Sequence, residues 1–198
     1  MSRQKEIGVK YKYGGLLTTL SYFYIDQENV IDIDVGSGKY RRAADGRDKF
    51  KGVEWTVNGK LAPKWTVTGG LMYIDAKRDK TQGGKNDGRF VNGVADWSGV
   101  LGLVYEPNDS LGIIGRVVWN DAAYIDNSNA PSGKTKIPSY TTFDLGVNYK
   151  THLGQIPVSL SAMCYNVANK DYWMGRGSST TFGLSMPRTF MLSARFEF

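Results

Sequence analysis

The sequence predicts an all-β fold, a segment of an antiparallel transmembrane β-barrel. Three observations support this prediction. Apolar and polar residues alternate in nine β-rich segments, short and long connections alternate between those segments, and the chain ends on an alternating aromatic strand. A period of two is the spacing at which the side chains of a strand share one face. Helical periodicity is found nowhere along the chain.

The composition is compatible with such a barrel. Of the 198 residues, 41% are hydrophobic, and no apolar run approaches the length of a transmembrane helix. A helical membrane protein is therefore excluded. A barrel agrees with the mean hydropathy of −0.36, because only alternate residues of its strands face lipid. The 24 glycines suit turns, and the 13% of aromatic residues suit strands and aromatic girdles.

The residue counts exclude several kinds of site. Cys164 is the single cysteine and His152 the single histidine, which excludes an intrachain disulfide and cysteine- or histidine-rich metal sites. The net charge is +6, but Lys and Arg are scattered through turns and loops, and no nucleic-acid-binding motif is present. Residues 1–6 lack the apolar core of a signal peptide, so we expect the chain to be incomplete at its start.

The nine predicted strands follow one another along the chain. Three show the alternation most clearly, with one face formed by Val53, Trp55 and Val57, by Ile113, Val117 and Trp119, and by Phe143, Leu145, Val147 and Tyr149. The predicted strands are 4–13, 15–34, 48–60, 64–76, 91–105, 111–123, 138–150, 156–168 and 187–198.

The connections are sorted by length. The short ones are Gly14, 61–63, 106–110 and 151–155. The long ones are 35–47, 77–90, 124–137 and 169–186. Outer-membrane barrels have short periplasmic turns and long extracellular loops in this alternation.

Aromatic spacing supports a membrane-spanning height. Trp65 and Tyr73 are eight residues apart on one predicted face, and Trp97 and Tyr105 repeat this arrangement. Eight tilted residues rise roughly 20 Å, close to the height of the apolar band between two aromatic girdles.

The end of the chain fixes the direction of every strand. Residues 190–198 alternate strictly, with Phe190, Leu192, Phe196 and Phe198 on one face. This ending resembles the C-terminal strand that the bacterial barrel-assembly machinery recognises. With that terminus in the periplasm, all long loops are extracellular and 4–13 begins at the outer surface. An odd strand count cannot close a bacterial barrel, so we expect the C-terminal part of a larger one.

Five segments, in order, resemble TonB-dependent siderophore receptors. Residues 52–65 (GVEWTVNGKLAPKW) are similar to the family's G-V-E…G-x-L-x-P-x-W segment, and 69–76 to its next strand. Residues 137–149 (IPSYTTFDLGVNY), 165–173 (YNVANKDYW) and 187–189 (PRT) resemble its I-P-x-Y…D-L…Y, N-x-x-N-K-x-Y-W and P-R-T motifs. The resemblance extends over essentially the whole chain.

This resemblance implies a function. The family's barrel has about 22 strands around an N-terminal plug with a TonB box. Residues 1–198 would then be the C-terminal portion of the barrel, without the plug and inactive in transport alone. The implied ligand is a ferric siderophore, with no covalent cofactor, no metal site and no catalysis. The implied partners are the TonB complex, through the plug, and outer-membrane lipid and lipopolysaccharide.

Candidate ligand contacts lie in the predicted extracellular loops, where aromatic and arginine side chains could hold a chelate. They are Tyr40, Arg41, Arg42, Arg47, Tyr124, Trp173 and Arg176. Four further charged residues are predicted on the inward face, where pairing with the plug is the favoured role: Glu54, Arg116, Asp144 and Arg195.

An autonomous small outer-membrane barrel, acting as a pore or a hydrolase, is the alternative function. A hydrolase would need Ser/His or Asp/His groups on one rim, but His152 falls on the predicted periplasmic side, away from the long loops. A soluble β-sandwich is a more distant alternative.

Overall fold

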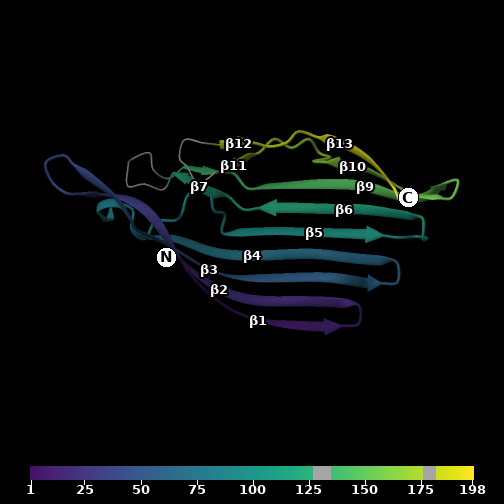
Figure 1. Ribbon diagram of the computed structural model, residues 1–198, viewed down its shortest axis with the longest axis horizontal. Coiled ribbons are helices and arrows are strands. Elements are labelled where there is room, and N and C mark those ends of the chain that lie inside the picture. The colour runs from purple at the N-terminus through teal and green to yellow at the C-terminus, as the bar shows by residue number, and fades with distance from the viewer. Residues whose placement is uncertain (127–134, 176–181) are drawn as a thin grey trace.

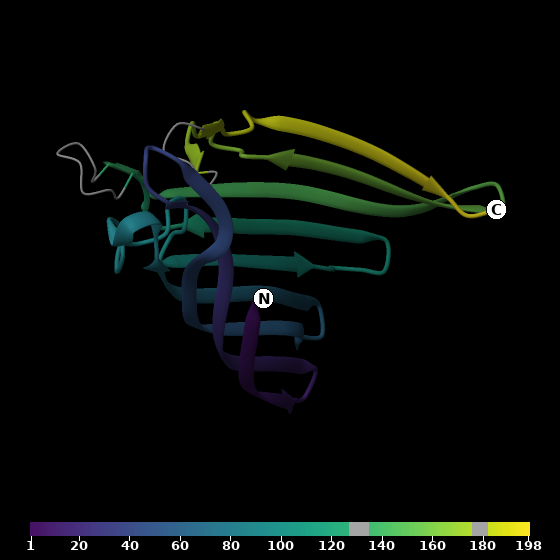
Figure 2. The ribbon, with the colours of Figure 1, turned by 60° about the vertical axis from the view of Figure 1, so that its left-hand side comes forward.

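The computed structural model describes residues 1–126, 135–175 and 182–198, and most of them form one twisted, curved antiparallel sheet (Figures 1 and 2). Its nine strands are β1 (Arg3–Tyr13), β2 (Leu16–Asp34), β3 (Tyr40–Ala62), β4 (Trp65–Lys80), β5 (Trp97–Tyr105), β6 (Leu111–Asn120), β9 (Tyr140–Leu153), β10 (Ile156–Tyr165) and β13 (Thr189–Phe196). All nine predicted strands are confirmed. Within the described ranges, no helix is long and apolar enough to cross a membrane.

Each strand pairs with its neighbours in chain order, so the sheet is a continuous meander. The turn end of the sheet carries the links at 14–15, 63–64, 106–110 and 154–155. The loop end carries the other connections, which include a 3₁₀ turn, η1 (Gln82–Gly84), and two small ribbons. One ribbon is β7 (Ala123–Asp126) with β8 (Thr135–Ile137), and the other is β11 (Trp173–Gly175) with β12 (Phe182–Leu184).

The predicted strand boundaries differ most from the structure at two places. The predicted loop 35–47 is a turn of residues 35–39, because β3 begins at Tyr40 and pairs with β2 from Asp34 onward, apart from a bulge between Asn29 and Ile31. This extension lacks an apolar face, but backbone pairing alone can continue a strand. The predicted strand 91–105 begins only at Trp97. Residues 91–96 run along the end of β4 instead, where Val91 N–H donates to the Ala76 carbonyl.

The two faces of the sheet differ in chemistry. Across the strands, Leu20, Trp55, Leu71, Gly99 and Trp119 are direct partners on one face. Their chain neighbours form the next row, on the opposite face: Ser21, Glu54, Met72, Ser98 and Asn120. We call these the apolar face and the polar face. An exposed apolar face of this kind is compatible with contact with lipid.

Burial follows the same alternation in β9. Thr142, Asp144 and Gly146 are buried, whereas Phe143 and Leu145 are exposed. The other exposed apolar residues of this face include Tyr22, Val53, Tyr73, Leu101, Leu160, Phe190 and Leu192. A soluble protein buries such side chains, so their exposure over a contiguous face is typical of a lipid-facing wall.

The predicted aromatic spacing becomes two cross-strand pairs between β4 and β5. Near the turn end, the Trp65 and Tyr105 rings stack with centroids 4.6 Å apart. Near the loop end, the Tyr73 and Trp97 rings are 5.0 Å apart. All four rings lie on the apolar face, at its two borders.

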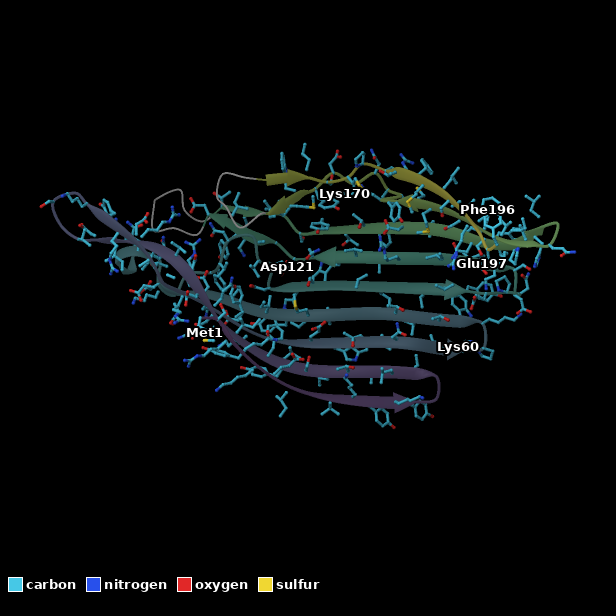
Figure 3. All side chains as sticks on the ribbon, viewed as in Figure 1. Met1, Lys60, Asp121, Lys170, Phe196 and Glu197 are labelled. Atoms are coloured by element: carbon cyan, nitrogen blue, oxygen red, sulfur yellow. The ribbon has the colours of Figure 1, made fainter. Side chains whose placement is uncertain are left out.

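The two termini lie at opposite ends of the strands. At the loop end, the Met1 ammonium forms an ion pair with the Glu28 carboxylate. At the turn end, Glu197 N–H donates to the Pro157 carbonyl, 3.1 Å away. Figure 3 shows Lys60, Phe196 and Glu197 at this turn end. The odd strand count is therefore confirmed, and the described sheet is not closed, because β1 pairs only with β2 and β13 only with β10.

Candidate ligand-binding surface at the loop end

The first group of predicted contacts belongs to the extended β2–β3 hairpin. A cavity of about 550 Å³ lies between this hairpin and the turn at 81–87, and Tyr40, Asp45 and Lys80 line it. The Lys80 ammonium is 2.7 Å from an Asp45 carboxylate oxygen. This hydrogen bond, together with the charge of Lys80, lowers the pKa of Asp45.

Of the predicted arginines of this hairpin, Arg47 lies apart from Arg41 and Arg42. Arg41 and Arg42 follow Tyr40 in β3 and are exposed. Arg47 points toward the first two strands. Its guanidinium is 3.3 Å from the Asp26 carboxylate and donates to the Met1 carbonyl at 3.1 Å.

A second cavity, of about 280 Å³, lies where the loops after β4, β6 and β10 meet. Trp173 lines it, together with Asn120, Tyr140, Ile137 and Met174. Asn120 ends β6 on the polar face, and Tyr140 is its cross-strand partner on β9, so two of the lining residues belong to the polar face. Figure 3 places Asp121, another lining residue, at the loop end of β6.

Two tyrosines that the sequence analysis did not single out form the aromatic core of this second site. The Tyr140 and Tyr172 rings stack with centroids 3.9 Å apart. The Asn120 side-chain amide donates to the Tyr140 hydroxyl at 2.8 Å. Tyr172 precedes Trp173 directly, so this stack supports the backbone from which the Trp173 side chain extends. A signal for Tyr140 was present, since it lies within the 137–149 motif at the loop end of a predicted strand.

Tyr124 takes part in a different cluster. Its ring stacks on Phe90 with centroids 5.3 Å apart, and the Lys136 ammonium is 4.3 Å from the Tyr124 ring centroid. Phe90 forms a β-bridge with Lys77, which lies on the same face of β4 as Tyr73. This cluster therefore lies on the side of the apolar face, whereas Trp173 lines the second cavity.

Arg176 lies outside the described residues. The other predicted contacts fall into three places: the β2–β3 hairpin with Tyr40, Arg41 and Arg42, of which Tyr40 lines the hairpin cavity, the outer cluster with Tyr124, and the second cavity with Trp173. Arg47 lines neither of these two cavities. Over the described ranges, no group of three or more His, Cys, Asp or Glu side chains is arranged to hold a metal ion.

The four charged residues predicted on the inward face all lie on the polar face. Arg116 and Asp144 are direct cross-strand partners, with an Nη2–Oδ2 distance of 2.6 Å. Arg195 forms a longer contact with Glu197, at 3.4 Å. Glu54 is exposed in the polar row of β3.

Comparison with known proteins identifies the family. Residues 1–167 match the family described as "TonB dependent receptor-like, beta-barrel". The chain belongs to the TonB-dependent receptor β-barrel family. The predicted resemblance is thus confirmed, and this family accounts for a sheet with a lipid-facing and a polar face.

Two curated relatives of this TonB-dependent receptor barrel match it along nearly the whole chain. The ferrichrome receptor FcuA of Yersinia enterocolitica is 29% identical over 203 residues, covering 100% of this chain and 26% of that receptor. The ferripyoverdine receptor of Pseudomonas aeruginosa is 28% identical over 211 residues, covering 98% of this chain and 24% of that receptor. The chain therefore spans about a quarter of the length of these relatives.

A solved structure agrees with the fold. The crystal structure of BauA, the ferric preacinetobactin receptor of Acinetobacter baumannii, superimposes with a TM-score of 0.86 and 28% sequence identity. The match covers 100% of this chain and 29% of BauA. These relatives are transport receptors rather than enzymes.

Proposed function

We propose that this chain forms part of the barrel of an outer-membrane receptor that takes up ferric siderophores in a TonB-energised process. The main support is the chain-long similarity to receptors for ferrichrome, ferripyoverdine and ferric preacinetobactin. The loop end supplies a matching surface, since aromatic side chains line a cavity there to which the polar face contributes Asn120 and Tyr140.

In this proposal the chelate binds at the loop end before it passes along the polar wall. The rings of Tyr140, Tyr172 and Trp173 offer apolar contact, and the arginines of the β2–β3 hairpin offer positive charge. Movement of a plug, driven through TonB, would then open the path. The predicted contacts at Tyr40, Arg41, Arg42, Arg47, Tyr124 and Arg176 remain candidate ligand contacts of the receptor.

Ligand binding tests this proposal directly. In the receptor that carries this chain, purified in detergent, Trp173→Ala should weaken binding of a ferric siderophore by roughly tenfold, the loss expected for a buried aromatic contact. The matched control is Trp55→Ala, because Trp55 is equally exposed but lies on the lipid-facing wall. Equal affinities of the Trp173→Ala, Trp55→Ala and wild-type receptors would contradict the proposed site.

We further propose that residues 1–198 do not transport alone. The unpaired outer edges of β1 and β13 support this, since unpaired backbone groups in lipid cost several kcal/mol each. Expression of residues 1–198 in a receptor-null strain should not restore siderophore-dependent growth. Restored growth would overturn this part of the proposal.

The loop end is proposed to be extracellular and the C-terminus periplasmic, as in outer-membrane barrels with short periplasmic turns. Single cysteines introduced into a Cys164→Ala background test this. A membrane-impermeant thiol reagent should label Lys85→Cys on intact cells but not Ala62→Cys or Leu153→Cys. The reverse pattern would invert the orientation.

Lipopolysaccharide is a proposed partner of the apolar face at its loop-end border. Beyond Val53 and Tyr73 the same face becomes charged, with Lys51 and Lys77 around Asp75 and with Lys49 opposite Lys77. Cations at that level suit the phosphates of an outer-leaflet lipid. Neutral substitution of the three lysines should lower the lipopolysaccharide retained on purification, whereas Lys12→Gln and Lys60→Gln at the turn end should not.

The terminal strand is the proposed contact of the barrel-assembly machinery. Residues 190–196 keep their apolar alternation beside β10, and Phe198 is fully exposed. Deletion of Phe198 should reduce the amount of assembled receptor in the membrane without changing its affinity for the chelate.

A further inference from the structure

Asp144 is the one ionisable residue among the buried side chains of the described ranges. It lies in the loop-end half of β9 on the polar face, and its side chain is 5% exposed. A buried carboxylate is costly unless it is fully hydrogen-bonded, so its partners indicate why it is there.

The two carboxylate oxygens of Asp144 serve different elements. Oδ2 accepts hydrogen bonds from Arg116 on β6, at 2.7 Å from Nε and 2.6 Å from Nη2. Oδ1 accepts the backbone N–H of Asn166, 2.8 Å away. Arg116 also lies 5.7 Å from the ring centroid of Tyr165, the last residue of β10. The carboxylate thus links the wall to the point where the last loop begins.

Asn166 in turn joins both ends of that loop. Its side-chain amide donates to the carbonyls of Lys170 and Met186, at 2.9 and 3.0 Å, and its Oδ1 accepts the Lys170 N–H. Asn166 is buried, with a φ of 50°, a left-handed conformation that asparagine tolerates better than most residues. A second asparagine, Asn169, adds a bond from the Arg188 N–H at 2.9 Å.

The segments clasped in this way carry the aromatic side chains of the proposed site. The Ser185 N–H donates to the Tyr172 carbonyl at 2.9 Å, and the Tyr172 N–H donates to the Ser185 hydroxyl at 3.2 Å. Tyr172 stacks on Tyr140, and Trp173 follows it. A chain of hydrogen bonds and ring contacts therefore connects Asp144 to the cavity through Asn166 and the two loop ends, and all of its members are described residues.

We propose that Asp144 is a positioning residue, which holds the two ends of the last loop and thereby sets the position of Tyr172 and Trp173 at the ligand cavity. Arg116 keeps the carboxylate oriented, and Asn166 transmits its position to the loop. The effect on ligand binding rests on the proposed siderophore function, whereas the anchoring of the loop does not.

Hydrogen exchange on the receptor that carries this chain tests the anchor without any ligand. In Asp144→Ala, the amides of residues 166–170 and of Ser185, Met186 and Arg188 should exchange at least roughly tenfold faster. The reason is that local opening of the loop ends no longer has to break the hydrogen bond between the Asn166 N–H and Asp144. Amides of residues 146–150 in β9 should keep their wild-type rates. Asp144→Asn, which retains an oxygen for the Asn166 N–H, should give an intermediate change.

The matched control is Glu54→Gln, another carboxylate on the polar face but in an exposed position on β3. It should leave exchange in both loop ends unchanged. If Asp144→Ala does not fold, Asn166→Ala removes the clasp while the Arg116–Asp144 pair remains, and the same amides decide the outcome.

Ligand release provides the second readout. Asp144→Ala should speed dissociation of a bound ferric siderophore by about fivefold or more, with a nearly unchanged association rate, as expected when a prearranged contact is loosened. Unchanged exchange in Asp144→Ala and Asn166→Ala overturns the anchor, and faster exchange with unchanged release overturns the positioning role. A wild-type receptor that binds no ferric siderophore counts against the proposed function instead, and the exchange result still decides the anchor.

Discussion

The strand wall and the loop end of this barrel segment are organised by different physics. In the wall, each side chain takes its face from its position in the strand, as the alternating burial of Thr142, Phe143 and Asp144 shows. At the loop end, contacts join residues far apart in sequence, such as Tyr140 with Tyr172 and Phe90 with Tyr124. In the wall, the face of a residue is therefore set by the local sequence, and substitutions that keep the character of that face are tolerated. At the loop end, the structure depends on particular pairs of residues.

The largest loss of stability should come from placing a charge on the apolar face of the wall. Leu101 lies on the apolar face in the middle of β5, and Val100, its chain neighbour, lies on the polar face. Leu101→Arg should destabilise the receptor by about 2–4 kcal/mol, the cost of a charge facing the lipid midplane. The free energy of unfolding in urea, measured in phospholipid vesicles, checks this.

Val100→Arg is the matched control for Leu101→Arg. The same charge, one residue away, points to the polar side and should change the unfolding free energy far less. Equal losses of unfolding free energy in the two variants would mean that the two faces are not in contact with different solvents, lipid on one side and water on the other.

A second effect tests packing within the wall. A Cβ at Gly52 would lie 2.6 Å from the Phe23 ring atom Cζ and would also clash with the Tyr73 carbonyl oxygen. Gly52→Ala should therefore cost about 1–3 kcal/mol of unfolding free energy in the same assay, as overpacking does. At Gly70, also on the polar face, the nearest atom is 3.7 Å away, so Gly70→Ala should be close to neutral. A neutral Gly52→Ala would contradict the close approach of Phe23.

The aromatic borders should contribute less. Removing one ring of the Trp65–Tyr105 stack, as in Trp65→Leu, forfeits about 0.5–1.5 kcal/mol beyond the change in buried area. A double-mutant cycle with Tyr105→Leu isolates this term in urea unfolding. A coupling energy of zero would show that the two rings are only neighbours.

The smallest effect concerns the loop end and depends on pH. Because Lys80 lowers the pKa of Asp45, their contact stabilises the hairpin above the ordinary carboxyl pKa and is lost as the pH falls through the lowered value. A spin label at Lys39→Cys, in a Cys164→Ala background, should become more mobile on acidification. In Lys80→Gln the ion pair is absent at every pH, so the change in mobility on acidification should be lost, whereas Lys49→Gln, which removes the separate pair with Asp79, should leave it in place.

The same contrast explains what could be predicted from sequence. The nine strands, their faces and the aromatic pairs of β4 and β5 follow from period-two alternation, and the polar position of Asp144 follows with them. Alternation says nothing about where two backbones continue to pair without an apolar face, so the extension of β3 to Tyr40 was missed. It also cannot bring distant loops together, so Tyr140 and Tyr172 were missed, although Trp173 and Tyr40 were found at cavities.

The β2–β3 hairpin, which extends beyond the neighbouring strands at the loop end (Figure 1), has a consequence for the molecule as an antigen. Its outer part, from the Ile31–Ala43 pair to the Asp34–Tyr40 pair, is a ribbon of two strands, and such a ribbon is only marginally stable in water by itself. The rest of the sheet, with which the ribbon is continuous, stabilises its structure. Antibodies raised against a linear peptide of residues 30–46 will therefore recognise the unfolded chain, whereas antibodies against the intact surface will require the barrel.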